Sequence, residues 1–311
     1  MKKYIKIAGN ILMTASFAFV VKKLLDMDIS LSQLSSGRVA AAAGICFAVQ
    51  TLIIICSCFP WLMFTRSLSG VRIPFSAAVP VYTRSNLYKY IPGNVFQYVG
   101  RNQLAADMSI SHVDVACATL LDIFFCVFWT GAVSAVLLGG RIADLLGKYG
   151  GRLLIVIIAG IALLGLLAAV LLIKFGDRVR GYLSRYSKAF EKGRRGQFMS
   201  GVGYYFLHNC VSAGMYLACI ALVVPEASAD ELAVLTGAFM FAWIIGFVTP
   251  GAPGGIGIRE GVMIFVSGEK YQERIILFVL AIRIASILAD IAAFAIFCVF
   301  GKKKNAERRN C

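Results

Sequence analysis

Charge and histidine are the scarcest features of this sequence. Of its 311 residues only 15% are charged and two are histidines, whereas 59% are hydrophobic. A hydrolase or transferase needs a nucleophile with a base in reach, and two histidines supply few bases. One of them, His112, lies near the cytoplasmic boundary of a predicted membrane span. We therefore expect a protein that is not an enzyme, and a membrane enzyme acting on lipid phosphates is the disfavoured alternative.

The sequence also lacks a recognisable set of metal ligands. All but one of its nine cysteines lie inside apolar segments, where a free thiol behaves as a small hydrophobe. Cys56 and Cys58 form an isolated CxC pair with no second pair and no nearby histidine, which disfavours a zinc site. We predict neither a metal nor an organic cofactor.

Long apolar runs dominate the rest of the chain. Several reach about 20 residues, the length that crosses a bilayer as a helix, and they predict an all-α polytopic membrane protein. No small-residue cleavage motif follows the first run, so residues 1–25 are interpreted as a retained helix rather than a signal peptide. Six runs are predicted to be full transmembrane helices: 8–25, 39–64, 113–138, 153–173, 202–224 and 275–300.

The net charge of +15 is explained by membrane orientation, because Lys and Arg accumulate in cytoplasmic loops. Here they concentrate near the N-terminus, in the loop from Lys174 to Gln197 and in the tail 301–311, so both termini are predicted to be cytoplasmic. The basic loop and the tail are expected to dock on anionic lipid headgroups. Nucleic-acid binding is not expected. The sequence carries no signal for the oligomeric state.

Two further regions are interrupted by proline, glycine and charge. Region 232–266 contains TPGAPGGIGIRE at 249–260, and region 75–106 contains YIPGN at 90–94. Broken backbone at membrane depth persists only where protein buries it or a watery cavity solvates it. We predict two re-entrant helical hairpins, with 75–106 entering from the cytoplasmic side and 232–266 from the outside.

With these hairpins the chain divides into two halves, roughly 1–138 and 153–300. Each half has two spans, a hairpin and a final span, and the halves enter from opposite faces. The prediction is therefore an inverted repeat within a single transmembrane domain, 1–311, as is typical of transporters that alternate access around a midplane site.

A residue spacing that occurs in both hairpins supports this pairing of the halves. Arg101 stands nine residues after Pro92, and Arg259 stands nine residues after Pro250. The last span of each half also carries an acid, and these acids are Asp122 and Asp290.

At these residues the chain resembles the lysylphosphatidylglycerol synthase transmembrane-region family of flippase-like integral membrane proteins. The resemblance covers essentially the whole chain and rests on PGGIGIRE at 253–260, YIPGNVFQYVGR at 90–101 and the last span around Arg283. It implies two inverted re-entrant hairpins, a bacterial or archaeal cell membrane, and movement of a lipid headgroup between leaflets. The family often has an acidic–basic pair where this chain has Ala118 and Thr119.

The resemblance does not fix the cargo. Some family members carry a cytoplasmic aminoacyltransferase domain after the membrane region, but here only the short tail follows Phe300, so aminoacyl transfer is not expected. Stand-alone members are associated with polyprenyl-linked sugars or hopanoids.

Eight ionisable side chains are predicted at membrane depth, where leaving them in lipid would cost on the order of 20 kcal/mol. They must share a polar cavity. Its five basic and three acidic groups favour a phosphate or phosphodiester, because arginine binds phosphate oxygens in pairs and the hairpin tips add backbone donors. The residues predicted to bind the substrate are Arg84, Lys89, Asn94, Arg101, Asp122, Gly254, Gly255, Gly257, Arg259, Glu260, Arg283 and Asp290.

The leading functional hypothesis is a flippase-like lipid transporter. An anionic phosphate-bearing headgroup, of a phospholipid or a polyprenyl phosphate, would enter the cavity while its tails stay in the bilayer, and rocking of the halves would expose it to the other leaflet. Replacing Arg101 or Arg259 with Gln is expected to abolish translocation without loss of folded protein. The alternative function is a transporter or channel for a small soluble anion.

Structural roles remain open for several of these residues. Arg283 and Asp290 lie two turns apart on one helix face and could neutralise charges on neighbouring helices. Arg259 and Glu260 could form an ion pair that locks the hairpin.

Other polar residues also have structural interpretations that involve no substrate. Arg84 and Lys89 could extend to the cytoplasmic interface. His208 and Asn209 are expected to form interhelical hydrogen bonds rather than to act in catalysis.

Overall fold

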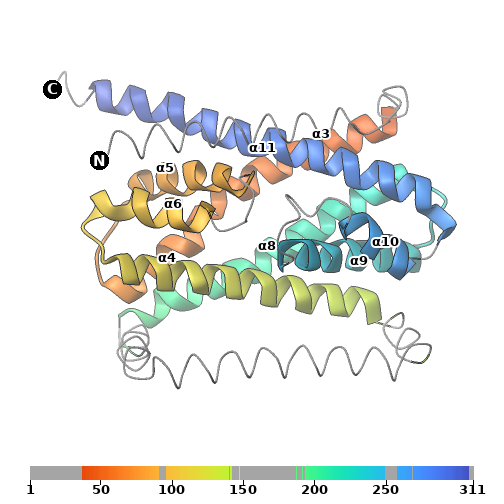
Figure 1. Cartoon of the computed structure of the whole chain (residues 1–311), viewed down its shortest axis with the longest axis horizontal. Coiled ribbons are helices and arrows are strands. Elements are labelled where there is room, and N and C mark those ends of the chain that lie inside the picture. The colour runs from red at the N-terminus through yellow and green to blue at the C-terminus, as the bar shows by residue number, and fades with distance from the viewer. Residues whose placement is uncertain are drawn as a thin grey trace.

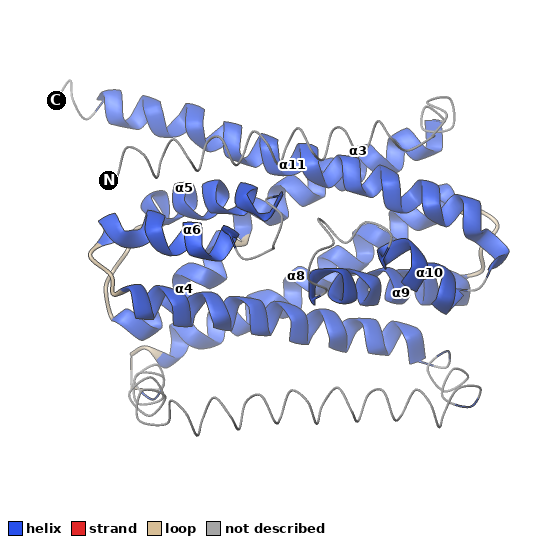
Figure 2. Cartoon of the chain, viewed as in Figure 1, coloured by secondary structure: helices blue, strands red, loops and turns tan. Residues whose placement is uncertain are grey.

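The computed structural model describes residues 37–90, 96–139, 193–248, 258–267 and 269–307, together with the single residues 141, 147, 187 and 191. Every regular element within this part of the chain is a helix, and the long helices follow the long axis of the molecule (Figures 1 and 2). The predicted all-α class is confirmed for these residues. The predicted spans 8–25 and 153–173 lie outside the described residues.

Five described helices are long and apolar enough to cross a membrane. At a rise of about 1.5 Å per residue, 20 helical residues cover about 30 Å, the thickness of the hydrocarbon core. Four of the five coincide with predicted spans, and the fifth corresponds to the first arm of the predicted outer hairpin. The five are Gly37–Ser69, His112–Gly139, Arg195–Val223 (α8), Ala229–Phe247 (within α9, Ala229–Val248) and Gln272–Phe297 (within α11, Gln272–Glu307).

The first of these helices is interrupted once, between α3 (Gly37–Cys56) and α4 (Cys58–Ser69). The Ser57 hydroxyl at the break donates a hydrogen bond to the Ile53 carbonyl at 2.7 Å. The helix then ends at Gly70, whose φ of 72° lies in the left-handed region that glycine tolerates.

A short helix pair follows and corresponds to the predicted hairpin 75–106. Its two arms pack side by side and approach closely at Gly100, where an added Cβ would lie 2.3 Å from the ring of Tyr88. We call this pair the inner hairpin, and its tip, with Pro92, lies outside the described residues. Its elements are α5 (Phe75–Asn86), η1 (Leu87–Tyr90), α6 (Phe96–Leu104) and η2 (Ala105–Met108).

The second helix pair, here called the outer hairpin, consists of α9 and α10 (Ile258–Ser267). Lys270, just beyond α10, lies 2.6 Å from the carboxylate of Glu231 in the first turn of α9. The hydrogen bond with this carboxylate raises the pKa of Lys270. Because the chain leaves α10 beside the point where it entered α9, the pair returns to its starting end. Its tip, 249–257 with Pro250, lies outside the described residues.

The two hairpins approach the middle of the molecule from opposite ends (Figure 1). Each packs in its own apolar cluster, and α8 contributes to both. Phe198 and Tyr205 of α8 pack with α4, α5 and helix His112–Gly139, whereas Met215 and Cys219 pack with α3, α9, α10 and α11. The long helix α8 therefore connects the surroundings of one hairpin to those of the other.

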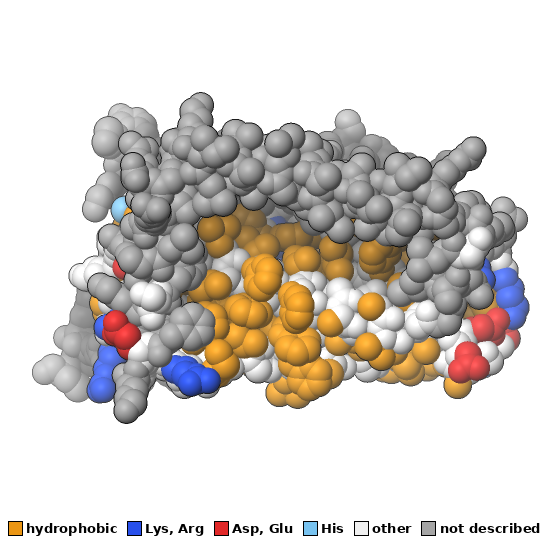
Figure 3. Space-filling model, turned by 90° about the horizontal axis from the view of Figure 1, so that it is seen from below, with side chains coloured by type: hydrophobic (Ala, Val, Ile, Leu, Met, Phe, Trp, Pro, Cys, Tyr) orange, Lys and Arg blue, Asp and Glu red, His pale blue; other side chains and the backbone are white. Residues whose placement is uncertain are grey.

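One face of the molecule has the charge distribution that a bilayer requires. Figure 3 shows hydrophobic side chains across the middle of one face, with Lys, Arg, Asp and Glu gathered at its two ends. Large side chains such as Leu52, Leu120 and Phe124 are exposed on described helices. A hollow interrupts this apolar belt, and a basic side chain is visible inside it (Figure 3).

Candidate functional site

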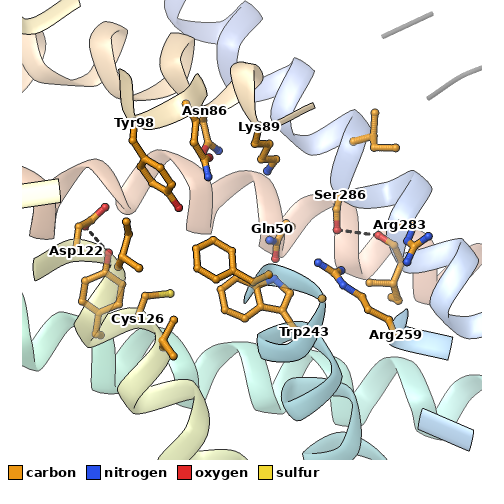
Figure 4. Close-up of a pocket in the computed structure, with 18 of the residues that line it drawn as sticks. Gln50, Asn86, Lys89, Tyr98, Asp122, Cys126, Trp243, Arg259, Arg283 and Ser286 are labelled. Carbon is orange, nitrogen blue, oxygen red and sulfur yellow. Dashed lines mark hydrogen bonds between the residues drawn. The ribbon is translucent and has the colours of Figure 1, made fainter. Parts of the chain in front are cut away.

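A cavity of about 260 Å³ lies between the two hairpins. Its wall includes residues of both hairpins and of α3, α8, α11 and helix His112–Gly139 (Figure 4). Small-molecule sites in proteins usually measure about 300–1,000 Å³. The cavity is slightly smaller than that range, so it can hold a headgroup or a small anion but not a lipid with its tails.

Arg101 of α6 forms one end of the cavity and is almost completely buried, with 2% of its surface exposed. Its Nη1 donates to Oδ2 of Asp122 at 2.9 Å, and its Nε donates to the Ser85 hydroxyl at 3.2 Å. The guanidinium also stacks on the ring of Tyr82, 4.0 Å from the ring centre. The Tyr205 hydroxyl of α8 donates to the other oxygen of Asp122. Arg101 therefore joins the inner hairpin to two long helices.

Lys89, in η1 of the inner hairpin, reaches the cavity and a second buried carboxylate. Its Nζ lies 2.6 Å from Oδ2 of Asp290 on α11, and the Asn86 amide donates to Oδ1 of the same carboxylate at 3.0 Å. The Asp290 side chain is 1% exposed, whereas Lys89 keeps 32% of its side chain exposed. Asp290 is therefore held by two groups of the inner hairpin, while part of Lys89 stays accessible.

Arg259 and Arg283 line the opposite part of the cavity, where Figure 4 shows them beside each other. Arg259 is the second residue of α10, so it projects from the helix end at which the macrodipole is positive. Arg283 belongs to α11 and is 8% exposed. Two guanidinium groups and a helix N-terminus at one wall form an arrangement that attracts an anion.

Aromatic rings complete the wall between the two basic ends. Trp243 and Phe247 of α9 stack nearly parallel, with ring centres 5.3 Å apart and an interplanar angle of 7°. Tyr98 of α6 and Tyr216 of α8 line the same cavity. These rings provide flat apolar surfaces beside the charged groups.

The structure brings five of the twelve predicted substrate-binding residues to the cavity wall, and a sixth, Asp290, binds Lys89 there. Four basic side chains and two carboxylates among the described residues leave an excess of two positive charges. Arg84 of α5 is not among the described residues that line the cavity. The five on the wall are Lys89, Arg101, Asp122, Arg259 and Arg283.

Five predicted binding residues are not tested by the structure. Asn94, Gly254, Gly255 and Gly257 lie outside the described residues. Glu260 belongs to α10, but its side chain is not described, so its proposed pairing with Arg259 stays a prediction.

Three alternative structural interpretations can be compared with the geometry. Asp290 neutralises a charge of a neighbouring element, because its carboxylate pairs with Lys89, whose ammonium group lies at the cavity wall. Asn209 forms an interhelical hydrogen bond, because its Oδ1 accepts from the Thr130 hydroxyl at 2.8 Å. His208 does not show the expected bond at Nδ1, which is buried without a hydrogen-bond partner among the described residues, and its ring packs beside Tyr204 and Tyr205 of the same helix.

Several cavity residues escape prediction from sequence. Gln50 lies alone in an uncharged apolar run, and Trp243 resembles any packing or interfacial aromatic residue. Tyr205 carries no local signal for its bond to Asp122. Asn86 and Tyr98 could have been found from the polarity of the inner hairpin, where an amide and a phenol stand close to its basic residues.

Comparisons with known proteins give no further guidance on this cavity. The chain matches no protein-family model, no curated protein and no solved structure at a significant level.

Proposed function

We propose that this protein is a flippase-like transporter that moves an anionic, phosphate-bearing lipid headgroup between membrane leaflets. The observation that carries the proposal is a single cavity to which both hairpins contribute arginine. Arg101 comes from the inner hairpin and Arg259 from the outer hairpin, and Arg283 joins them from α11. Such a wall can replace part of the water that a phosphate loses on leaving the membrane surface.

In the proposed topology both hairpins are re-entrant, and the four described spanning helices outside the hairpins, together with 8–25 and 153–173, supply six full spans. The ends of α9 and α10 support this for the outer hairpin, because Lys270 and Glu231 join its entry and exit at 2.6 Å. The end that carries Arg72, Arg194 and the tail would be cytoplasmic, since positive charge accumulates there.

Binding would begin at the outer-hairpin wall. A phosphate oxygen can accept hydrogen bonds from Arg259 and Arg283 and receive additional attraction from the α10 N-terminus. Lys89 also lines the cavity and is one third exposed, although Asp290 balances its charge. Arg101 would contribute its field rather than direct contacts, because Asp122, Ser85 and the Tyr82 ring surround its guanidinium.

The apolar belt favours a lipid over a free anion. In Figure 3 the described side chains that border the hollow are mostly hydrophobic, and the hollow lies away from the charged ends of the molecule. A lipid could therefore place its headgroup in the hollow while its tails remain in hydrocarbon, which avoids the cost of moving a bare phosphate through the membrane.

Lipid movement can be measured in proteoliposomes that contain fluorescent phosphatidylglycerol, with a membrane-impermeant quencher added outside. We expect the wild-type protein to move the lipid between leaflets. Arg259→Gln and Arg283→Gln should each slow this at least about tenfold, because a hydrogen bond to a charged group contributes about 1.5–3 kcal/mol. Arg274→Gln is the matched control, since Arg274 also belongs to α11 but is 49% exposed and pairs with Glu226.

Wild-type rates in both cavity variants would contradict the proposal. Efflux of trapped inorganic phosphate or chloride without lipid movement would instead support transport of a small soluble anion.

A further inference from the structure

Gln50 is the polar residue of α3 that faces the centre of the cavity (Figure 4). It lies in an apolar helix that carries no charged residue between Arg38 and Arg66. Its side-chain oxygen, Oε1, is buried, and no group of the described residues donates a hydrogen bond to it. An acceptor is therefore held at the cavity centre without a donor from the described part of the chain.

The neighbouring polar side chains of α3 and α4 behave differently. The hydroxyls of Thr51, Ser57 and Thr65 each donate to a carbonyl one helical turn earlier, at 2.6–2.7 Å. A hydroxyl group can donate its hydrogen bond to a carbonyl of its own apolar helix in this way, whereas an amide oxygen is an acceptor and needs a donor from elsewhere. Buried polar groups in proteins almost always have a partner, either protein or ordered water, so an acceptor left open at a cavity wall is available to a donor on a bound molecule.

The surroundings of Gln50 indicate which part of a bound ligand would carry that hydrogen-bond donor. Arg259 and Arg283 line the same cavity and are the proposed ligands of the phosphate, and all groups that line a cavity of about 260 Å³ lie close to any headgroup that fills it. A phosphate bound by the arginines has no proton to donate as a diester. Of the groups on such a ligand, a hydroxyl of the alcohol part is the one that can donate to Gln50, and the stacked rings of Trp243 and Phe247 provide a flat surface for its carbon skeleton.

We propose that Gln50 is a specificity-determining residue that accepts a hydrogen bond from a hydroxyl group on the alcohol part of a phosphodiester headgroup. This inference rests on the proposed function and narrows its substrate class. It favours lipids whose phosphate is esterified to a polyol, either glycerol or a sugar, over lipids with the same charge and no hydroxyl. Gln50 selects among anionic lipids, while the arginines bind the phosphate that these lipids share.

Matched lipids test the inference directly. Phosphatidylglycerol and phosphatidylpropanol have the same charge and the same headgroup length and differ only in two hydroxyls. Binding of each to the full-length detergent-solubilised protein can be compared by native mass spectrometry. We expect the wild type to prefer phosphatidylglycerol about tenfold, the usual effect of one net hydrogen bond at a desolvated site. A second pair, a polyprenyl glucosyl phosphate and a polyprenyl methyl phosphate, separates a sugar source of the hydroxyl from a glycerol source.

Two variants test whether Gln50 causes the preference for phosphatidylglycerol. Gln50→Met keeps the length of the side chain and removes the acceptor, so the preference should fall to about one while phosphatidylpropanol binding stays unchanged. Thr51→Val is the matched control on the same helix, because Thr51 does not line the cavity and bonds to its own backbone. This control should keep the wild-type preference.

The possible results distinguish this inference from the proposed function. Equal binding of both lipids of each pair by the wild type, which needs no variant to fold, overturns the role of Gln50 and leaves the proposed function standing. A preference that survives in Gln50→Met also overturns it. Binding of none of the four lipids overturns both proposals.

Discussion

Replacing Arg101 with Gln should destabilise the fold rather than merely remove a ligand for the substrate. Arg101 and Asp122 are both buried, and the structure joins them at 2.9 Å. Removing one partner of a buried ion pair leaves an uncompensated charge and typically costs about 3–5 kcal/mol. This differs from the sequence-based expectation that Arg101→Gln abolishes transport without loss of folded protein. Of the two arginines named in that expectation, Arg259 is the better test of function.

A double-mutant cycle measures this contribution. Arg101→Gln alone should lose stability by several kcal/mol, whereas Arg101→Gln combined with Asp122→Asn should recover most of the loss, because the remaining groups are neutral and can bond to each other. Thermal unfolding of the detergent-solubilised variants, followed by size-exclusion fluorescence, gives the comparison. Equal stability of Arg101→Gln and wild type would refute the reasoning, and so would a double variant no more stable than the single one.

Three further predictions address the inner hairpin and the topology. Lys89→Met should lower the unfolding temperature by an amount equivalent to about 2 kcal/mol, less than for Arg101 because Lys89 is 32% exposed, and neutralising its partner carboxylate should reverse the loss. Gly100→Ala should cost about 1–3 kcal/mol of stability, since the added Cβ would overlap an aromatic ring at 2.3 Å, and an unchanged unfolding temperature would contradict the packing of the two arms. Arg72→Cys and Glu226→Cys should react with an impermeant thiol reagent from opposite sides of sealed vesicles, and labelling from one side only would overturn the proposed topology.

The sequence predicts the helices well because membrane helices are encoded in continuous runs of residues. The predicted span 39–64 lies within the observed Gly37–Ser69, and 113–138 lies within His112–Gly139. The interruptions at 90–94 and 249–257 likewise separate helices that turn back on themselves, since clustered proline and glycine residues disfavour a continuous helix. Each of these predictions depends only on local sequence.

Residues whose charged side chains would cost much free energy in lipid could also be assigned to the cavity from sequence. Lys89, Arg101, Arg259 and Arg283 must avoid hydrocarbon, and a single polar cavity is the simplest place for them. The same argument fails for Arg84, which lies five residues before Lys89. Residues at that spacing do not share a helix face, so the charge of a residue alone does not decide which wall it faces.

Ion-pair partners could not be predicted, because they depend on which helices become neighbours. The internal repeat of arginine nine residues after proline suggests equivalent surroundings for Arg101 and Arg259. Asp122 does pair with Arg101, but Asp290 in the second half pairs with Lys89 of the inner hairpin. The place of Gln50 in the cavity could not be predicted either, because a single uncharged amide in an apolar run gives no periodic or compositional signal.

The two hairpins are therefore held in different ways, although the sequence predicts two inverted halves. Buried carboxylates on two separate helices bind the inner hairpin, through Arg101 at one point and Lys89 at another. The outer hairpin is joined at its base by the exposed pair of Lys270 and Glu231, which contributes little because water screens it. Hydrogen bonds from the Ser134 hydroxyl and from Nε of Arg141 to carbonyls of α9 and α10 also hold it. If transport requires one hairpin to move relative to the cavity, movement of the inner hairpin must break two buried ion pairs. Bending of the outer hairpin about its base breaks neither of them, so exchange of access is expected to begin at the outer hairpin, where Arg259 would move with the bound phosphate.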